Sequence, residues 1–297
     1  MLIVLMGLAM AGCSAIGTGV PIQVPLTTPP SAYIASVPFY AQSQYQCGPA
    51  SLAMTLQWAG VAVNPEQLVS AVYTPGRKGS LQSGLIAAAR RHGKLAYPFK
   101  GLACLLREVA AGRPVIVLQN LGLKWFPRWH YAVVVGYDLD QHVVVLHTGT
   151  RASRRVGLKT FAHTWKRADD WGLLVLPAGQ MPQCAQENRY LNAAFGLQIA
   201  GHTQAAINAF DSALRQWPHS ADASIALGNA LYAQGSTPKA IRAYYRAIQI
   251  EPQNADALNN LAHLLAESDA LDEAESMAVR AVDLGGPRID IYRKTLE

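Results

Sequence analysis

The sequence predicts an α+β domain over residues 33–178, followed by an all-α repeat domain over residues 187–297. Within the first region, apolar helical segments alternate with short apolar strands. From residue 187 onward, small residues recur with a period of 34, which is typical of stacked helical pairs. Residues 179–186 form the linker between the two regions.

The N-terminal segment, residues 1–12, is apolar and uncharged and ends in small residues just before Cys13. It resembles a bacterial lipoprotein signal peptide. The resemblance implies that Cys13 becomes the lipidated first residue of the mature chain, with residues 13–32 as a flexible tether. Because Ser14 follows the cysteine, the resemblance implies an outer-membrane lipoprotein of the bacterial cell envelope that faces the periplasm. An ordinary signal peptide or a short uncleaved segment is the alternative.

Cys47 stands directly before an apolar helical run over residues 50–59. Pro49 suits the first turn of a helix, where its missing N–H costs nothing. The helix dipole at this position lowers the pKa of a thiol and favours the reactive thiolate. A buried structural cysteine is the ordinary alternative.

Two further residue types complete the pattern of a thiol hydrolase. Gln42 lies five residues before Cys47, where its amide can donate a hydrogen bond to an oxyanion, and Gln44 and Gln46 are competing candidates. His130 begins an apolar strand. A histidine far from a cysteine in sequence can lie beside it in the fold and act as its base.

These segments resemble the double-glycine, bacteriocin-leader-processing cysteine peptidases, and among them the free-standing bacterial members without a transporter. The resemblance is carried by residues 37–42 (VPFYAQ), 46–54 (QCGPASLAM) and 130–134 (HYAVV). It implies a papain-like cysteine peptidase domain with Cys47 as nucleophile and His130 as general base and acid. It also implies Gln42 as the oxyanion donor.

The family normally has an aspartate after the histidine strand, which orients the imidazole. In this sequence His147 stands at that position and is the candidate third member of the triad. A neutral histidine cannot stabilise an imidazolium as a carboxylate does. Asp138 or Asp140 could take the role instead, or the site could work as a Cys–His dyad.

The loop over residues 120–129 is rich in aromatic side chains immediately before the histidine. Trp125 and Trp129 are candidates for the wall of a peptide-binding cleft, and packing of a lid is the alternative. No HExxH, CxxC or pair of histidines with metal-ligand spacing occurs, so neither a metal nor another cofactor is predicted. The four cysteines do not predict a disulfide framework, and Cys104 is expected in the core.

The C-terminal region divides into three units, residues 187–220, 221–254 and 255–288, with a short cap over 289–297. Small residues recur where paired helices must approach closely, and a proline or glycine ends each second helix. This is the signature of tetratricopeptide repeats. Such stacks bind peptides or protein segments on their concave face, so other proteins are the expected partners. The candidate peptide contacts are Asn229, Tyr232, Asn259 and His263.

Charge is unevenly distributed along the chain. Residues 1–186 carry 16 basic and 6 acidic side chains, and residues 187–297 carry 9 and 13. No basic run with interleaved aromatic residues occurs, so nucleic acid is not an expected partner. The sequence thus predicts a lipid-anchored cysteine peptidase with a protein-binding repeat domain. Acyl transfer by the same chemistry, a catalytically degenerate peptide-binding adaptor and a self-association scaffold are the alternatives.

Overall fold

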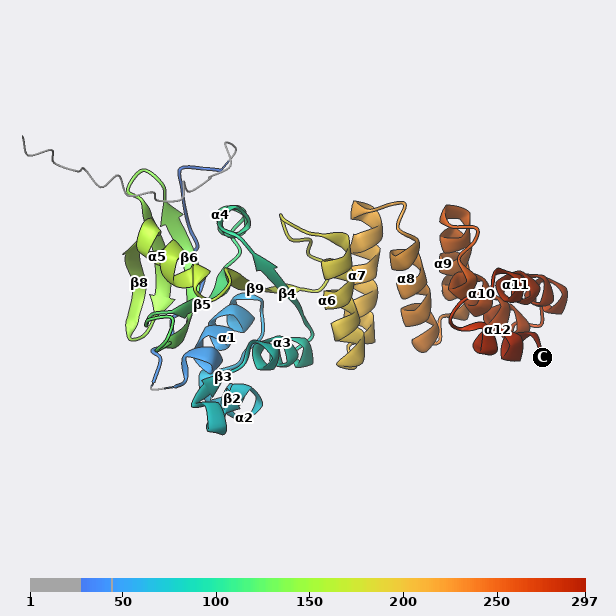
Figure 1. The fold of residues 1–297 in the computed structure, drawn as a ribbon, viewed down its shortest axis with the longest axis horizontal. Coiled ribbons are helices and arrows are strands. Elements are labelled where there is room, and N and C mark those ends of the chain that lie inside the picture. The colour runs from blue at the N-terminus through green and yellow to red at the C-terminus, as the bar shows by residue number, and fades with distance from the viewer. Residues whose placement is uncertain (1–27, 44) are drawn as a thin grey trace, which may run out of the picture.

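The computed structural model describes residues 28–43 and 45–297, and shows an α+β domain followed by an extended stack of helices (Figure 1). The predicted signal segment over residues 1–12, Cys13 and the competing candidate Gln44 lie outside the described residues. Within the described ranges, no helix is long and apolar enough to cross a membrane. The predicted fold class, an α+β domain and then an all-α domain, is confirmed.

A seven-stranded antiparallel sheet forms the centre of the first domain. Strand β6 lies at its middle and pairs with β5 and β7, and its far end pairs with β1. Apart from β1, the strand order is β4-β9-β5-β6-β7-β8. The strands are β1 (Ser31–Tyr33), β4 (Lys94–Lys100), β5 (Val115–Asn120), β6 (Trp129–Asp138), β7 (Val143–Thr148), β8 (Arg151–Gly157) and β9 (Trp171–Pro177).

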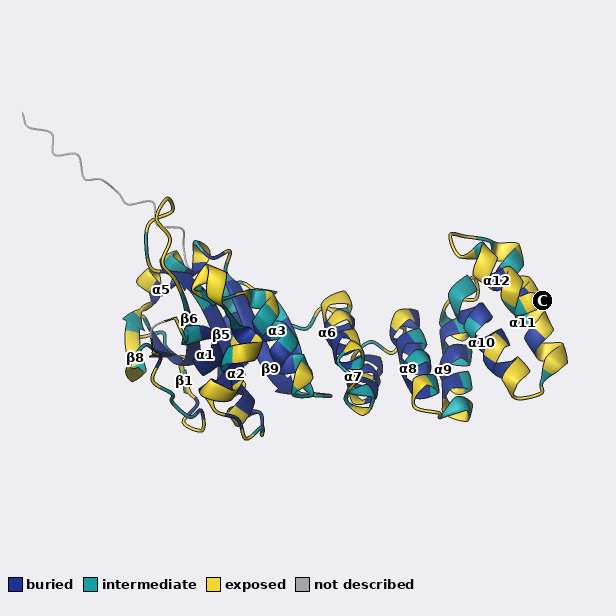
Figure 2. Cartoon of the chain, turned by 90° about the horizontal axis from the view of Figure 1, so that it is seen from below, coloured by how far each residue is buried: buried dark blue, intermediate teal, exposed yellow. Residues whose placement is uncertain are grey.

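Helix α1 (Cys47–Trp58) packs against β6 and is buried from Gly48 to Leu56, so both sides of it are covered. Figure 2 shows this helix and the sheet behind it as the buried centre of the domain. A short hairpin of β2 (Tyr73–Thr74) and β3 (Gly79–Ser80) lies near the start of α1. The other helices are α2 (Pro65–Val72), α3 (Gln82–Arg91), α4 (Leu102–Ala110) and α5 (Leu158–Lys166), and residues 75–77 form a 3-10 turn.

Three features differ from the sequence expectations. Ser31 and Ala32, assigned to the tether, belong to β1, because their backbone completes the edge that β5 leaves open on β6. Strand β8 and helix α5 were not predicted. Strand β8 is largely exposed, and its sequence, RASRRVG, contains three arginines and only one large apolar residue. It therefore lacks the alternating apolar pattern by which a strand is predicted.

The second domain consists of three helical pairs and a final helix. Gly228 shows why small residues recur: a Cβ there would lie 2.7 Å from the ring of Tyr244. The pairs are α6 (Glu187–Ile199) with α7 (Thr203–Gln216), α8 (Ala221–Ala233) with α9 (Thr237–Ile250) and α10 (Ala255–Glu267) with α11 (Leu271–Leu284). Helix α12 (Ile289–Leu296) follows.

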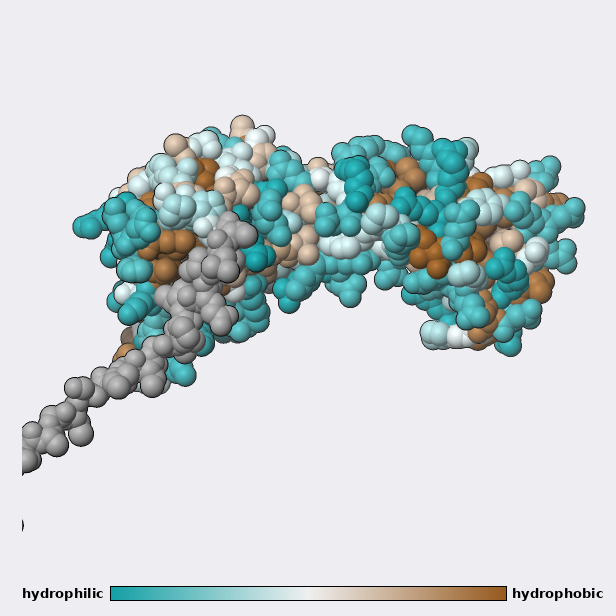
Figure 3. Space-filling view, turned by 90° about the horizontal axis from the view of Figure 1, so that it is seen from above, coloured by the Kyte–Doolittle hydropathy of each residue, from teal (hydrophilic) through white to brown (hydrophobic). Residues whose placement is uncertain are grey.

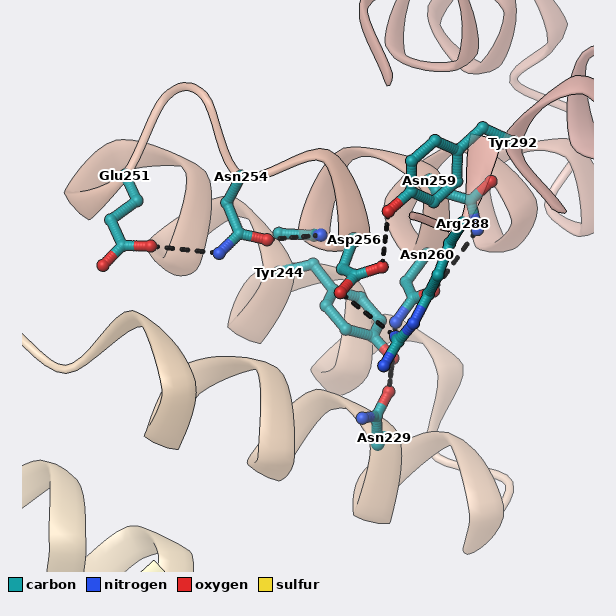
Figure 4. A network of polar contacts seen from close by, with 10 residues as sticks. Asn229, Tyr244, Glu251, Asn254, Asp256, Asn259, Asn260, Arg288 and Tyr292 are labelled. Atoms are coloured by element: carbon teal, nitrogen blue, oxygen red, sulfur yellow. Dashed lines mark hydrogen bonds and ion pairs between the residues drawn. The ribbon is translucent and has the colours of Figure 1, made fainter. Parts of the chain in front are cut away.

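Polar contacts fasten this last helix to the stack (Figure 4). Tyr292 on α12 donates a 2.7 Å hydrogen bond to Asp256, and Arg288 forms an ion pair with the same carboxylate at 3.1 Å. The ring of Tyr292 is buried against Leu258 and Ala281. The final helix therefore covers an end of the apolar interior that would otherwise face water.

The two domains share a packed junction. Helix α6 lies against β4 and α3, and the guanidinium of Arg90 covers Gly196 so closely that a Cβ there would be 2.2 Å away. Tyr97 on β4 accepts a 3.0 Å hydrogen bond from the backbone N–H of Gln186 in the linker. The first helical pair is therefore held on the edge of the sheet. Apolar patches remain on the surface of both domains (Figure 3).

Candidate active site

Cys47 is the first residue of α1, and two local features fix its position. The chain enters the helix through Tyr45, which adopts a left-handed conformation with φ of 65°. Gly48 is required because a Cβ there would lie 2.3 Å from the hydroxyl of Ser80 on β3. The Cys-Gly step therefore lets the short hairpin pack directly over the start of the helix.

The Cys47 thiol lies against the backbone of β6, at the residue that follows His130. Burial raises the pKa of this thiol, and the N–H groups of Tyr131, Gly48 and Cys47 itself oppose that effect only in part. The expectation of a lowered thiol pKa is therefore wrong, because desolvation outweighs the backbone dipoles. The structure thus brings the thiol to the start of the histidine strand.

His130 lies near the beginning of β6, paired in register with Gln119 on β5. Its Nε2 atom is 2.7 Å from the hydroxyl oxygen of Thr148 at the end of β7. Burial lowers the pKa of the imidazole, and the positive charge of Arg154 on β8 lowers it further. No sequence pattern pointed to Thr148, whose hydroxyl lies beside His130 where the third member of the triad is expected.

His147 does not take that role, and the structure corrects its assignment. It pairs in register with Val133, and consecutive strand residues point to opposite faces of a sheet. Its Nε2 lies 3.2 Å from the carbonyl oxygen of Val37, and its Nδ1 accepts a hydrogen bond from the N–H of Ser153. Both ring nitrogens are therefore engaged away from His130. Asp138 is also remote in the sheet, at the opposite end of β6.

Gln42 is buried beside the same part of β6. Its amide nitrogen lies 3.2 Å from both the carbonyl oxygen of Tyr131 and the hydroxyl of Ser51. Its amide oxygen accepts a 2.8 Å hydrogen bond from the N–H of Gly149, just after β7. Gln42 thus joins α1 to β6 and to the turn after β7, and it shares Tyr131 with the Cys47 thiol.

The aromatic loop, residues 121–128, leads directly into the strand of His130. Asn120 holds it closed, because its side-chain oxygen accepts 2.9 Å hydrogen bonds from the N–H groups of Gly122 and Arg128. Trp125 within the loop is 81% exposed, and Trp129 just after it is 55% exposed. A loop with its backbone fixed therefore presents bulky apolar side chains to solvent next to the histidine.

The four candidate residues of the repeat domain differ in their environments. Asn229 accepts hydrogen bonds from Tyr244 and Asn260, so it contributes to the stack itself. Tyr232 on α8 donates a 2.8 Å hydrogen bond to Glu267, and its ring meets that of His263 edge to face. His263 and Glu267 project from α10, and the cluster of Tyr232, His263 and Glu267 is partly exposed.

Asn259 is 7% exposed, and its side-chain oxygen is buried without a hydrogen-bond partner among the described residues. A buried amide oxygen in this condition loses the hydrogen bonds that water would give it. Of the four candidates, Tyr232 and His263 offer accessible polar surface, Asn259 is enclosed, and the half-buried Asn229 has its side-chain oxygen engaged within the stack.

The comparisons with known proteins agree with this geometry. Residues 34–171 match the model of the Peptidase_C39 like family. Residues 199–255 and 231–284 match two tetratricopeptide repeat families. No curated protein matches the chain.

Two solved structures are similar to parts of this chain. A C39-like peptidase from Bacillus anthracis is 20% identical, and the match covers 49% of this chain and 97% of that one, with a TM-score of 0.41. The type III secretion translocator chaperone SycD from Yersinia enterocolitica is 19% identical, and covers 38% of this chain and 92% of that one, with a TM-score of 0.36. Residues 34–171 are thus similar to the peptidase C39-like family, and the segments that match tetratricopeptide repeat families follow that domain.

Proposed function

We propose that this chain is a cysteine peptidase that hydrolyses peptide bonds, with Cys47 as nucleophile and His130 as general base and acid. The observation that carries the proposal is the packing of helix α1 on β6, which places the Cys47 thiol near the N–H of Tyr131, the residue next to His130. The hydroxyl of Thr148 lies within hydrogen-bond distance of the His130 imidazole and can orient it.

The proposed reaction begins from a neutral thiol and a neutral imidazole. When the hydroxyl oxygen of Thr148 accepts a hydrogen bond from the Nε2–H group, the lone pair of Nδ1 is free to take the thiol proton as sulfur attacks the carbonyl carbon. The imidazolium then protonates the leaving amine, and neutral His130 activates the water that hydrolyses the thioester. The Cys47 backbone N–H and the Gln42 amide are the proposed oxyanion donors. Gln42 must loosen its contact with Tyr131 to do so.

The starting protonation state predicts how Cys47 reacts with iodoacetamide. Its thiol pKa is raised and the His130 pKa is lowered, so a thiolate–imidazolium pair is not the resting form. We expect alkylation of Cys47 to be slow at pH 5–6 and to rise through a midpoint above the free-thiol value of about 8.5. Mass spectrometry at each pH measures the rate. Fast alkylation at pH 5–6 that is lost in His130→Ala would contradict this resting state.

Substitutions in the site predict a graded loss of peptidase activity. His130→Ala removes the base and should lower kcat/KM by about 10²- to 10⁴-fold, and Cys47→Ala should abolish turnover. Thr148→Ala removes one hydrogen bond, worth about 0.5–1.5 kcal/mol, so a loss of about 2- to 10-fold is expected. Thr148→Ser keeps the hydroxyl and should retain activity.

A fluorogenic peptide library that varies the residue before the scissile bond measures these effects. His147→Gln is the matched control, since it alters the neighbouring residue on the other face and should leave kcat/KM near that of the unchanged protein. If the unchanged protein cleaves no library member, the adaptor alternative replaces the peptidase proposal. A larger loss in His147→Gln than in Thr148→Ala would show that Thr148 is not the orienting group.

We also propose that the repeat domain holds part of a protein substrate or partner on the surface around Tyr232, His263 and Glu267. The support is a partly exposed aromatic and charged cluster contributed by two neighbouring repeats. Trp125 and Trp129 are proposed to contact the segment of the substrate that lies near the catalytic pair. Aromatic side chains held on a fixed loop provide apolar contact area with little loss of side-chain freedom.

If the repeats capture substrate, Tyr232→Ala should affect long substrates selectively. We expect KM for fluorescein-labelled casein to rise about 2- to 10-fold, because the variant loses its contacts with the long substrate. KM for a short fluorogenic peptide and kcat for both should stay unchanged. Tyr232→Phe keeps the ring and separates its role from that of the hydroxyl. Equal effects on casein and on the short peptide would contradict capture by the repeats.

The lipid anchor at Cys13 remains a proposal that rests on the sequence pattern. Expression in a Gram-negative host with radiolabelled palmitate should label the chain, and Cys13→Ser should lose the label and the membrane association. Cys47→Ser is the control and should keep both. Release of an unlabelled, shortened chain from the unchanged protein would instead indicate an ordinary signal peptide.

A further inference from the structure

Two cysteines outside the candidate active site lie together at the junction of the domains. Cys104 is buried on α4, and Cys184 lies in a turn of the linker that leads to α6. Their sulfur atoms lie within 4.8 Å of each other and of a carboxylate oxygen of Glu108. The two residues are 80 positions apart in sequence, so the folded chain brings them together.

The surroundings hold Cys184 in place against the first domain. Its backbone N–H donates a 3.2 Å hydrogen bond to Glu108, and its carbonyl oxygen accepts one of 3.3 Å from Tyr97. Arg113 forms a 3.0 Å ion pair with the other oxygen of Glu108 and donates a 2.7 Å hydrogen bond to the carbonyl oxygen of Met181. Several independent contacts therefore fix the linker beside Cys104 before any covalent bond forms.

We propose that Cys104 and Cys184 form a disulfide bond that joins helix α4 to the linker between the two domains. The thiol of Cys184 is the more accessible, and its neighbours favour the thiolate, because Cys104 donates to it and Arg107 lies nearby. The Cys184 thiolate attacks one sulfur of an oxidant disulfide, RSSR, and expels one thiolate. Cys104 loses its proton and displaces the second thiolate. Two cysteine thiols are oxidised, and RSSR is reduced to two RSH.

Glu108 decides between this disulfide and a metal site made of the same three residues. Both of its carboxylate oxygens are already engaged, one by Arg113 and one by the N–H of Cys184. A bound cation would share these oxygens with their two donors and would lie beside the positive charge of Arg113. A disulfide requires only that the two sulfur atoms approach, and the turn at residues 183–184 can adjust to allow this.

The full chain, incubated in a buffer of reduced and oxidised glutathione, tests the proposal. Free thiols are blocked with iodoacetamide under denaturing conditions, and trypsin is added without reduction. Cys104 then lies in the peptide Gly101–Arg107 and Cys184 in Ala168–Arg189. We expect these two peptides to be linked, the link to vanish with dithiothreitol, and the unfolding midpoint of the oxidised chain to rise by several degrees.

Cys184→Ser should lose both the link and the shift in midpoint, whereas Cys47→Ser should keep both. The result is therefore independent of catalysis at Cys47 and of the proposed peptidase activity. Glutathione on Cys184 together with alkylated Cys104 would overturn the proposal. About one zinc ion per purified chain by elemental analysis, with no linked peptide until the metal is chelated, would overturn it in favour of a metal site.

Discussion

Tyr131 connects the parts of the candidate active site through both its main chain and its side chain. Its N–H points to the Cys47 thiol, its carbonyl oxygen faces the Gln42 amide, and its hydroxyl donates to the carbonyl oxygen of Ser80. Its side chain is buried against Trp171, so it cannot shift without disturbing the sheet. One residue of β6 therefore sets the position of the helix start, the glutamine and the short hairpin relative to His130.

This arrangement has an electrostatic consequence. Enclosing the thiol and the imidazole in the same region removes solvent from both, and desolvation disfavours their charged forms. The pKa of Cys47 rises while that of His130 falls, so the two groups move away from a charge-separated pair. A carboxylate beside His130 would reverse the second shift, but the neighbouring group is the neutral hydroxyl of Thr148. In the proposed reaction, charge would then develop during attack rather than before it.

The sequence made Cys47, His130 and Gln42 candidates because each stands in a local pattern that needs no tertiary information. Thr148 was missed because the choice between two adjacent residues of β7 depends on which face each one points to. A shift of one residue along a strand reverses the face, and the register with Val133 is visible only in the folded sheet. The raised thiol pKa was missed for a related reason, since the hairpin that covers the helix start is made of very short strands.

The junction between the domains relates the candidate active site to the repeats. Helix α6 packs on β4, and Tyr97 and Glu108 form hydrogen bonds with the linker. The repeat domain is therefore not attached through a free linker. In the proposed function, a rigid connection would fix the path between a docked segment and the proposed catalytic pair, whereas a flexible one would only raise local concentration. Substrate choice would then depend on the spacing between the docked segment and the scissile bond as well as on sequence. Loosening the junction should weaken that spacing requirement without altering the chemistry at Cys47.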